Sequence, residues 1–362
     1  MEVFWRFRAV ADGRQCGENL TAVRFGGIIG GRHKLADIGH KEAQVENQLH
    51  YLSQADVESV GLTMVEIIDL LETAFQEKGM GRVEMPPKPG IHPGKGDNFI
   101  HAMPAYIPGM NSAGVKWVSG FPENHRRGLP YITGLLILND PETGIPLSVM
   151  DCVWITAMRT AAATAVAARR LARPDSSVLG VLGCGVQGRT NTEALQTLFP
   201  LERVMAYDVS PEAIDSFTRF VTTEFDLKVV PVDHPRGAVA GCDLVVTAGP
   251  ILKNPHATIQ AGWLEEGAFA SLVDFDSYWH PTALKEADKF CTDDLPQLEH
   301  YRQGGYFQDI PPIHADLGEL VTGNKPGRQT VEERTMACNL GLAMDDMAVA
   351  PTLYRRAVEQ GT

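Results

Sequence analysis

The sequence predicts an α/β protein in which a doubly wound parallel sheet is joined to a smaller α+β domain. Three observations support this fold class. From about residue 177 onward, short apolar segments alternate with helical patterns, as in a parallel sheet covered by helices. Between residues 84 and 120 the chain is rich in Pro and Gly and contains short apolar runs, which are typical of an antiparallel sheet. A Gly-rich turn at residues 183–188 directly follows the first of the later apolar segments.

The composition excludes several classes of protein. The 362 residues contain 32 Lys and Arg against 45 Asp and Glu, a net charge of −13, which argues against nucleic acid as the main partner. The sequence has no apolar run of about 18 residues, so no membrane-spanning helix is expected. The 6 cysteines are too far apart for zinc-ligand spacing, so we expect no metal and reduced thiols in the cytoplasm.

Residues 1–48 differ from the rest of the chain. Paired glycines at 26–27 and 30–31 interrupt any periodicity. We expect a poorly ordered N-terminal extension. The alternative is an arm that packs on a partner subunit.

The smaller domain is predicted to span residues 49–172 and to begin with helices. Ser53 is a candidate N-cap, and a second helix follows from about Thr63, where apolar residues recur at helical spacing. An Ala-rich helix is predicted over residues 156–172, and Pro174 marks the domain boundary. Antiparallel strands are predicted at residues 99–100, 115–118 and 133–138, with a turn at residues 139–141.

The larger domain is predicted to span residues 173–324, after which residues 325–362 return to the smaller domain. A helix is expected over residues 187–198, and another begins at Ser210, an N-cap followed by Pro211. Parallel strands are predicted at residues 177–182, 203–207, 228–232, 244–247, 268–273 and 289–292.

The Gly-rich turn has the pattern GxGxxG and the context of a dinucleotide site. It follows an apolar strand and opens a helix, and Asp208 ends the second strand. Gly183 permits the tight turn, Gly185 lets the backbone approach a pyrophosphate, and Gly188 allows close helix–strand packing. The helix N-terminus, with Val186 and Gln187, supplies N–H groups to the phosphates. The turn therefore predicts a Rossmann-type domain, and the alternative is a Gly-rich turn without a ligand.

The identity of the dinucleotide depends on Asp208. A carboxylate accepts hydrogen bonds from the ribose hydroxyls of NAD but repels the 2′-phosphate of NADP, so NAD is the predicted cofactor. Thr247 ends the fourth strand, at the edge of the sheet where ligands bind in open parallel sheets.

Several segments resemble the ornithine cyclodeaminase/mu-crystallin family. These are MPAY (103–106), GVKWVSGFPEN (114–124), MDCVWITAMRTAAATAVAARRLA (150–172), VLGCGVQG (181–188) and LGLAMDD (340–346). The resemblance covers roughly residues 49–355. It implies an NAD(P)-dependent protein that forms a homodimer through a smaller domain, which also binds a small amino-acid or imine substrate.

The resemblance also implies roles for four basic residues. Lys116 and Arg159 match residues that bind the substrate carboxylate, and Lys116 is also a candidate catalytic residue. Arg159 falls in the first turn of the expected Ala-rich helix, where the helix dipole favours an anion. Lys88 replaces a second carboxylate-binding Arg, and His101 replaces a Glu of the cyclodeaminases, so it is a candidate proton carrier. The alternatives are a surface role for Arg159 and Lys116 and a structural role for His101.

Two further residues are assigned through the resemblance. Asp276, at the end of the fifth strand, matches the acid that handles protons on the substrate nitrogen. Asp274 lies on the same strand face, so the assignment is open between the two. Asn339 aligns with the loop that meets the nicotinamide.

The function that these features predict is action at the Cα–N bond of an α-amino acid. The first expectation is an ornithine cyclodeaminase, in which a hydride passes to NAD and returns, so that ornithine gives proline and ammonia without net redox change. The alternative is an amino-acid dehydrogenase or imine reductase. A mu-crystallin-like binding protein is disfavoured by Asp208 and Asp276.

Overall fold

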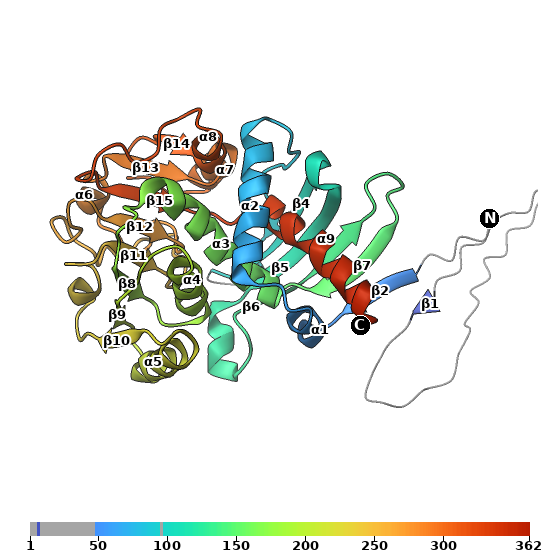
Figure 1. Cartoon of the computed structure of the whole chain (residues 1–362), viewed down its shortest axis with the longest axis horizontal. Coiled ribbons are helices and arrows are strands. Elements are labelled where there is room, and N and C mark those ends of the chain that lie inside the picture. Colours follow the sequence, from blue (N-terminus) through green and yellow to red (C-terminus); the bar gives the residue numbers. More distant parts are fainter. Residues whose placement is uncertain (1–5, 8–47, 95–96) are drawn as a thin grey trace, which may run out of the picture.

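The computed structural model describes residues 6–7, 48–94 and 97–362, which form two sheets with helices between them (Figure 1). The predicted N-terminal extension lies outside the described residues except at Arg6–Phe7 (β1) and Gln48. The two-sheet α/β architecture predicted from the sequence is confirmed.

The smaller domain is built on a seven-stranded sheet in the order β1-β2-β7-β6-β5-β4-β3. The strands from β3 to β7 are antiparallel as predicted, but β2 pairs with β7 in parallel, so the sheet is mixed. Neither β2 nor β7 was predicted from the sequence. The strands are β2 (Gln48–Leu52), β3 (Gly90–Ile91), β4 (Phe99–Ile107), β5 (Ser112–Gly120), β6 (Ile132–Asn139) and β7 (Pro146–Asp151), with 3₁₀ turns η1 (Pro108–Met110) and η2 (Pro122–Arg127).

The first two helices begin where predicted, from the candidate N-cap Ser53 and from the apolar spacing after Thr63. Ser53 caps α1 (Gln54–Ser59) and Thr63 caps α2 (Met64–Gly79), each in a reciprocal capping box with the acid three residues later. Both side chains therefore satisfy N–H groups that the first helical turn leaves free.

The Ala-rich helix α3 (Val153–Leu171) lies between the two sheets (Figure 1). Most of its side chains are buried, and the small alanines allow α2, α4 and α9 to pack closely on it. The helix begins earlier than predicted, because the Asp151 carboxylate accepts a hydrogen bond from the N–H of Val153 at 2.8 Å. Arg159 therefore lies in the second turn rather than the first, and the helix dipole acts on it less strongly.

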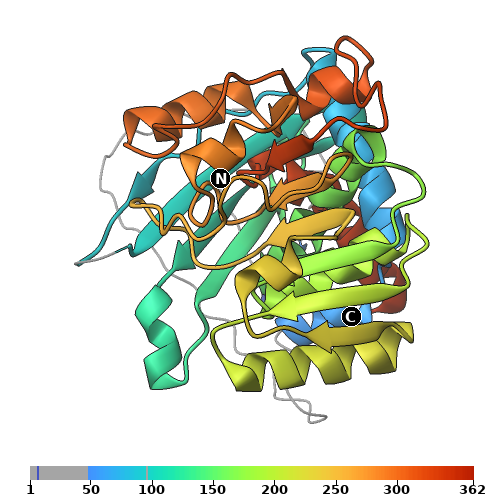
Figure 2. The same cartoon turned by 90° about the vertical axis from the view of Figure 1, so that its left-hand side faces the viewer.

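The larger domain holds an eight-stranded sheet in the order β10-β9-β8-β11-β12-β15-β13-β14, with every recorded pair parallel (Figure 2). Its strands are β8 (Val178–Leu182), β9 (Arg203–Tyr207), β10 (Lys228–Pro231), β11 (Leu244–Thr247), β12 (Phe269–Leu272), β13 (Lys289–Thr292), β14 (Ala315–Asp316) and β15 (Thr335–Cys338). Its helices are α4 (Val186–Gln196), α5 (Pro211–Phe225), η3 (Pro235–Ala238), α6 (Pro281–Leu284), α7 (Leu295–Gln303) and α8 (Leu317–Val321).

The boundary predicted at residue 324 does not coincide with the end of this sheet. β15 lies between β12 and β13, so the parallel sheet takes its strands from residues up to Cys338. Only α9 (Ala343–Gln360) returns to the smaller domain, where it packs on β4 and β5.

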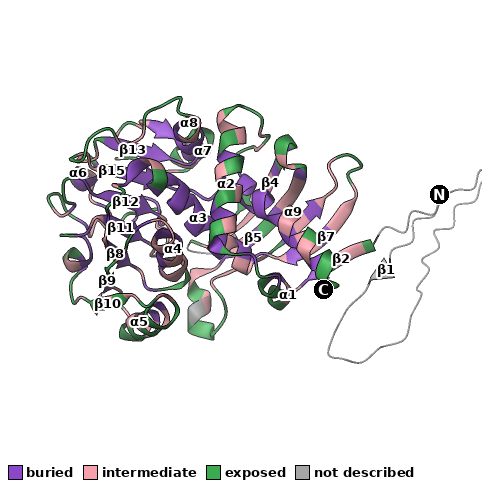
Figure 3. Ribbon diagram, viewed as in Figure 1, coloured by how far each residue is buried: buried purple, intermediate pink, exposed green. Residues whose placement is uncertain are grey.

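Two hydrophobic cores hold these layers together. One surrounds α3 and fills the space between the sheets, and the other lies under the opposite face of the parallel sheet (Figure 3). Among the described residues, no helix is long and apolar enough to cross a membrane.

Candidate active site

The Gly-rich turn has the geometry of a phosphate-binding loop. Gly183 has a φ of 104°, and a side chain there would place its Cβ 2.6 Å from the carbonyl oxygen of Ala248. A Cβ on Gly188 would collide with the carbonyl of Gly183. At Gly185, in contrast, no described atom lies within 4 Å of the Cβ position, so the space over the N-terminus of α4 is open. This open cradle, faced by the free N–H groups of α4, fits a pyrophosphate.

Asp208, directly after β9, forms a hydrogen bond with this loop. Its Oδ2 accepts a hydrogen bond from the N–H of Cys184 at 2.7 Å, and its Oδ1 accepts one from Ser210 at 2.9 Å. Each carboxylate oxygen keeps a second lone pair, so both remain able to accept ribose hydroxyls.

The structure separates the two candidate acids after β12. Asp274 is buried, and both of its carboxylate oxygens accept hydrogen bonds. The hydroxyl of Thr247 donates to Oδ1 at 2.6 Å, and the N–H of Gly249 donates to Oδ2 at 2.9 Å. Burial raises the pKa of Asp274 to about 7. Asp276 is also buried, but its Oδ1 has no hydrogen-bond partner among the described residues. Burial raises the pKa of Asp276 as well, which favours proton uptake.

Thr247 and Asn339 differ in how their polar atoms are satisfied. The hydroxyl of Thr247 is wholly buried against Asp274, so its predicted contact with the cofactor remains a prediction. Asn339 follows β15 and is 2 % exposed, yet neither its amide nitrogen nor its amide oxygen has a partner in the described part of the chain. A buried amide without partners costs free energy, so this pair of atoms fits a ligand carboxamide.

Lys116 and Arg159 converge on one carboxylate. The Nζ of Lys116 lies 2.6 Å from Oδ2 of Asp346, and the Nε of Arg159 lies 3.3 Å from Oδ1 of the same residue. All three side chains are buried. Neither Nε nor Nη1 of Arg159 has a partner with hydrogen-bond geometry among the described residues, so the guanidinium keeps donors for a second carboxylate.

Lys88 holds the loop that follows β15. Its Nζ donates to the carbonyl oxygens of Leu340 at 2.8 Å and Gly341 at 2.9 Å. From the other side, Asp293 accepts hydrogen bonds from the N–H groups of the same two residues at 2.7 and 2.9 Å. Burial and the neighbouring Arg159 lower the pKa of Lys88 to about 7.

His101 lies close to this group of cations. Its ring stacks on Phe99 with centroids 4.4 Å apart. Burial lowers the pKa of His101 to about 3, and the charges of Lys88 and Lys116 act in the same direction. The imidazole is therefore neutral at physiological pH and does not change its charge there.

Three buried acids beside the candidate site were not named as site residues by the sequence reasoning, namely Asp293, Asp345 and Asp346. All three are buried beside the cations. The signal for the last two was present in the segment LGLAMDD, where two acids follow an apolar run in the first turn of a helix. No group of His, Cys, Asp and Glu in the described residues is arranged to hold a metal ion.

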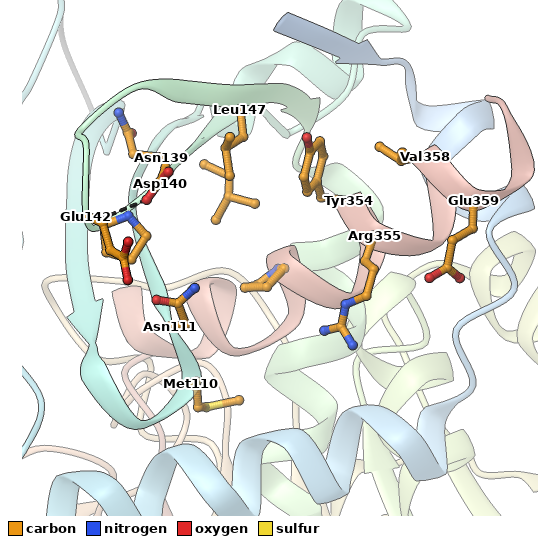
Figure 4. Close-up of a pocket in the computed structure, with 13 residues that line it drawn as sticks. Met110, Asn111, Asn139, Asp140, Glu142, Leu147, Tyr354, Arg355, Val358 and Glu359 are labelled. Carbon is orange, nitrogen blue, oxygen red and sulfur yellow. Dashed lines mark hydrogen bonds between the residues drawn. The ribbon is translucent and has the colours of Figure 1, made fainter. Parts of the chain in front are cut away.

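A separate cavity of about 680 Å³ lies at the other end of α9 (Figure 4). Tyr354 and Arg355 of α9 line one side of it, and Asp140 and Glu142, in the turn between β6 and β7, line another. None of the predicted site residues lines this cavity, so it is distinct from the candidate active site.

The comparisons with known proteins show the family of the chain. The model of the ornithine cyclodeaminase/mu-crystallin family matches residues 48–361. The chain belongs to the ornithine cyclodeaminase/mu-crystallin family. It is 37 % identical over 321 residues to an alanine dehydrogenase of Archaeoglobus fulgidus, covering 85 % of this chain and 95 % of that protein.

Two solved structures share the fold over most of this chain. One is a Δ1-pyrroline-2-carboxylate reductase of Thermococcus litoralis in complex with NADH and L-proline, with a TM-score of 0.79 and 31 % identity over 87 % of this chain and 99 % of that one. The other is an archaeal alanine dehydrogenase dimer with bound NAD, with a TM-score of 0.76 and 34 % identity over 87 % and 97 % of the two chains.

Proposed function

We propose that this family member is an NAD-dependent oxidoreductase that acts on the Cα–N bond of an α-amino acid or of the corresponding imine. The observation that carries the proposal is the buried pair Lys116 and Arg159 beside a loop whose Asn339 amide has no partner among the described residues. The pair fits a carboxylate and the amide fits a nicotinamide carboxamide. The relatives named above, an alanine dehydrogenase and an imine reductase, support the same chemistry.

The two parts of the site lie next to each other in the fold. The N–H of Asn339 donates to the carbonyl oxygen of Leu272 at 3.3 Å, so the loop after β15 lies beside the end of β12, which precedes Asp276. Lys88 contacts the same loop. A substrate bound by its carboxylate at Arg159 is therefore within reach of the cofactor edge of the parallel sheet.

Each residue has a defined role in the proposed reaction. Arg159 and Lys116 bind and orient the carboxylate, so that Cα faces the cofactor. NAD, when bound, accepts a hydride from Cα or, as NADH, returns one. Asp276 removes a proton from the substrate ammonium, because a protonated amine releases hydride poorly. Its raised pKa and its free Oδ1 suit this step.

A net redox reaction is favoured over cyclodeamination. A cyclodeaminase substrate carries a second amine. The resemblance implies that cyclodeaminases have a Glu at the position of His101, so this chain lacks that acid. That histidine has a lowered pKa, to which burial and the positive charges of Lys88 and Lys116 contribute. A second ammonium group there would be repelled by like charges. The cyclodeaminase reaction, expected first from the sequence, is the second candidate.

A panel of L-amino acids tests both candidates. NADH absorbance and ammonia release are followed together for alanine, proline and ornithine, with NAD as oxidant. NADH formed in proportion to substrate consumed supports the oxidoreductase. Ammonia from ornithine without net NADH supports the cyclodeaminase, and tight NAD binding with no turnover of any substrate contradicts both.

We also propose a homodimer formed through the open face of the seven-stranded sheet. On this face Trp117, in β5, is 50 % exposed, and its neighbour Leu135 in β6 is 41 % exposed. Tyr51, in β2, is 60 % exposed. Large apolar side chains side by side on an uncovered sheet favour burial against a second copy. The dimeric state of the related alanine dehydrogenase supports this assignment.

A further inference from the structure

Asp346 occupies the point where three separate elements meet. It lies in the first turn of α9, while Lys116 comes from β5 and Arg159 from α3. Its Oδ1 lies 2.7 Å from Nζ of Lys116 and 3.3 Å from Nε of Arg159. Lys116 and Asp346 are wholly buried and Arg159 is 5 % exposed, so water screens these contacts little.

The neighbouring Asp345 makes different contacts. Its Oδ2 accepts a hydrogen bond from the N–H of Leu342 at 2.9 Å and so closes the first turn of α9. It lies 3.5 Å from Nη1 of Arg159 and makes no recorded contact with Lys116. The two adjacent acids are equally buried, and only Asp346 bridges the two cations.

Lys116 depends on this bridge for its charge. Burial lowers the pKa of Lys116, and the positive charge of Arg159 lowers it further, whereas Asp346 raises it. The other groups near Lys116 are the hydroxyl of Thr156, at 3.2 Å, and the thiol of Cys152. Lys88 and His101, which lie close by, add no negative charge.

We propose that Asp346 is a positioning residue that aligns Lys116 and Arg159 toward one substrate carboxylate and keeps Lys116 charged. This proposal rests on the proposed function, since it names how the carboxylate site of that function is held. Asp346 itself does not touch the substrate, and it acts only through the two cations.

The proposal predicts a specific change in pH dependence. An opposite charge at contact distance typically moves a pKa by about 1–3 units. With Asp346→Asn, Lys116 should therefore lose its proton at a pH lower by about 1–3 units. Carboxylate binding should weaken as the pH rises through this new pKa, while at low pH, where Lys116 stays protonated, binding should be close to that of the wild type.

Calorimetry measures this without relying on turnover. The full chain, saturated with NADH, is titrated with pyrrole-2-carboxylate, a planar acid that carries a carboxylate beside a ring nitrogen, from about pH 6 to about pH 10. For Asp346→Asn, the midpoint of the loss of affinity should move to lower pH by about 1–3 units. Asp345→Asn is the matched control: it removes an equally buried charge that is not paired with Lys116, and its amide oxygen can still accept the N–H of Leu342, so its midpoint should stay at the wild-type pH.

Other outcomes contradict the proposal. An unchanged midpoint for Asp346→Asn shows a merely structural role. A wild type that binds no carboxylate at all overturns the proposal, because Lys116 and Arg159 then form no carboxylate site. If Asp346→Asn fails to fold, the double variant Lys116→Met/Asp346→Asn removes both charges of the buried pair. Recovery of folding in the double variant supports the coupling, and equal instability refutes it. A wild type that binds the carboxylate but turns over no amino acid contradicts the proposed function and leaves this inference standing.

Discussion

Gly341 lies directly against the guanidinium of Arg159. A Cβ on Gly341 would lie 2.5 Å from Nη1 of Arg159, and the φ of Gly341 is 74°, a conformation that L side chains rarely adopt. The close contact connects the loop held by Lys88 and Asp293 to the group that should bind the substrate carboxylate.

Gly341→Ala should raise KM for the amino acid at least tenfold, because the new methyl group displaces Arg159. Gly361→Ala is the control, since Gly361 has a φ of 72° and no described atom within 4 Å of its Cβ position. Both changes should cost about 1 kcal/mol of stability through backbone strain. If steady-state kinetics show the same KM for the two variants, the contact does not position Arg159.

Asp276→Asn should lower kcat by about 10²–10⁴-fold, because it keeps the shape of the side chain and removes its basicity. NAD affinity should stay near normal. Asp274→Asn is the comparison, and it should mainly lower stability, because the donors of Thr247 and Gly249 lose one of their acceptors. A complete loss of turnover in the Asp274 variant alone would move the base to that residue.

NAD should bind at least tenfold more tightly than NADP, a difference of about 1.4 kcal/mol, because Asp208 faces the position of the 2′-phosphate. Asp208→Ala should remove this preference. It should also weaken binding of both dinucleotides, because the N–H of Cys184 loses the carboxylate that holds it. Titration calorimetry with each dinucleotide measures both effects, and equal dissociation constants in the wild type would refute the assignment.

His101 should make the protein more sensitive to acid. Its folded pKa, about 3, lies below the ordinary value of 6.5, so between these values only the unfolded chain binds the proton. Its contribution to stability therefore falls as the pH drops from 6.5 toward 3 and is constant above 6.5. The variant His101→Phe can still stack on Phe99. When the pH is lowered from about 7 to about 5, its free energy of unfolding, measured with urea, should decrease less than that of the wild type. A wild-type slope that persists in the variant would assign the acid sensitivity to other groups.

Trp117→Glu should dissociate the proposed dimer, because it places a charge in the apolar sheet face that the second copy would cover. Sedimentation velocity should then show a monomer, while circular dichroism stays unchanged because the residue is half exposed. Val331→Glu is the control, since Val331 is 64 % exposed and lies in the larger domain. A wild type that sediments as a monomer would refute the dimer.

Local signals in the sequence determined much of the fold. Ser53, Thr63 and Ser210 cap the helices that follow them, since a cap acts within three residues of chain. The bounds predicted for β9, β11 and β13 coincide with the structure, because each is a short apolar run bounded by loop residues. The Gly-rich turn was recognisable for the same reason, as its pattern lies within six residues.

Only the tertiary structure decided which buried charges meet. Lys116 and Asp346 are 230 residues apart in the chain, and Lys88 and Leu340 are 252 apart, so no local pattern pairs them. The difference between Asp274 and Asp276 likewise depends on Thr247, at the end of the neighbouring strand β11, and on Gly249, in the loop after it. Sequence periodicity fixes the face on which a side chain lies, whereas its hydrogen-bond partner depends on which elements pack against that face.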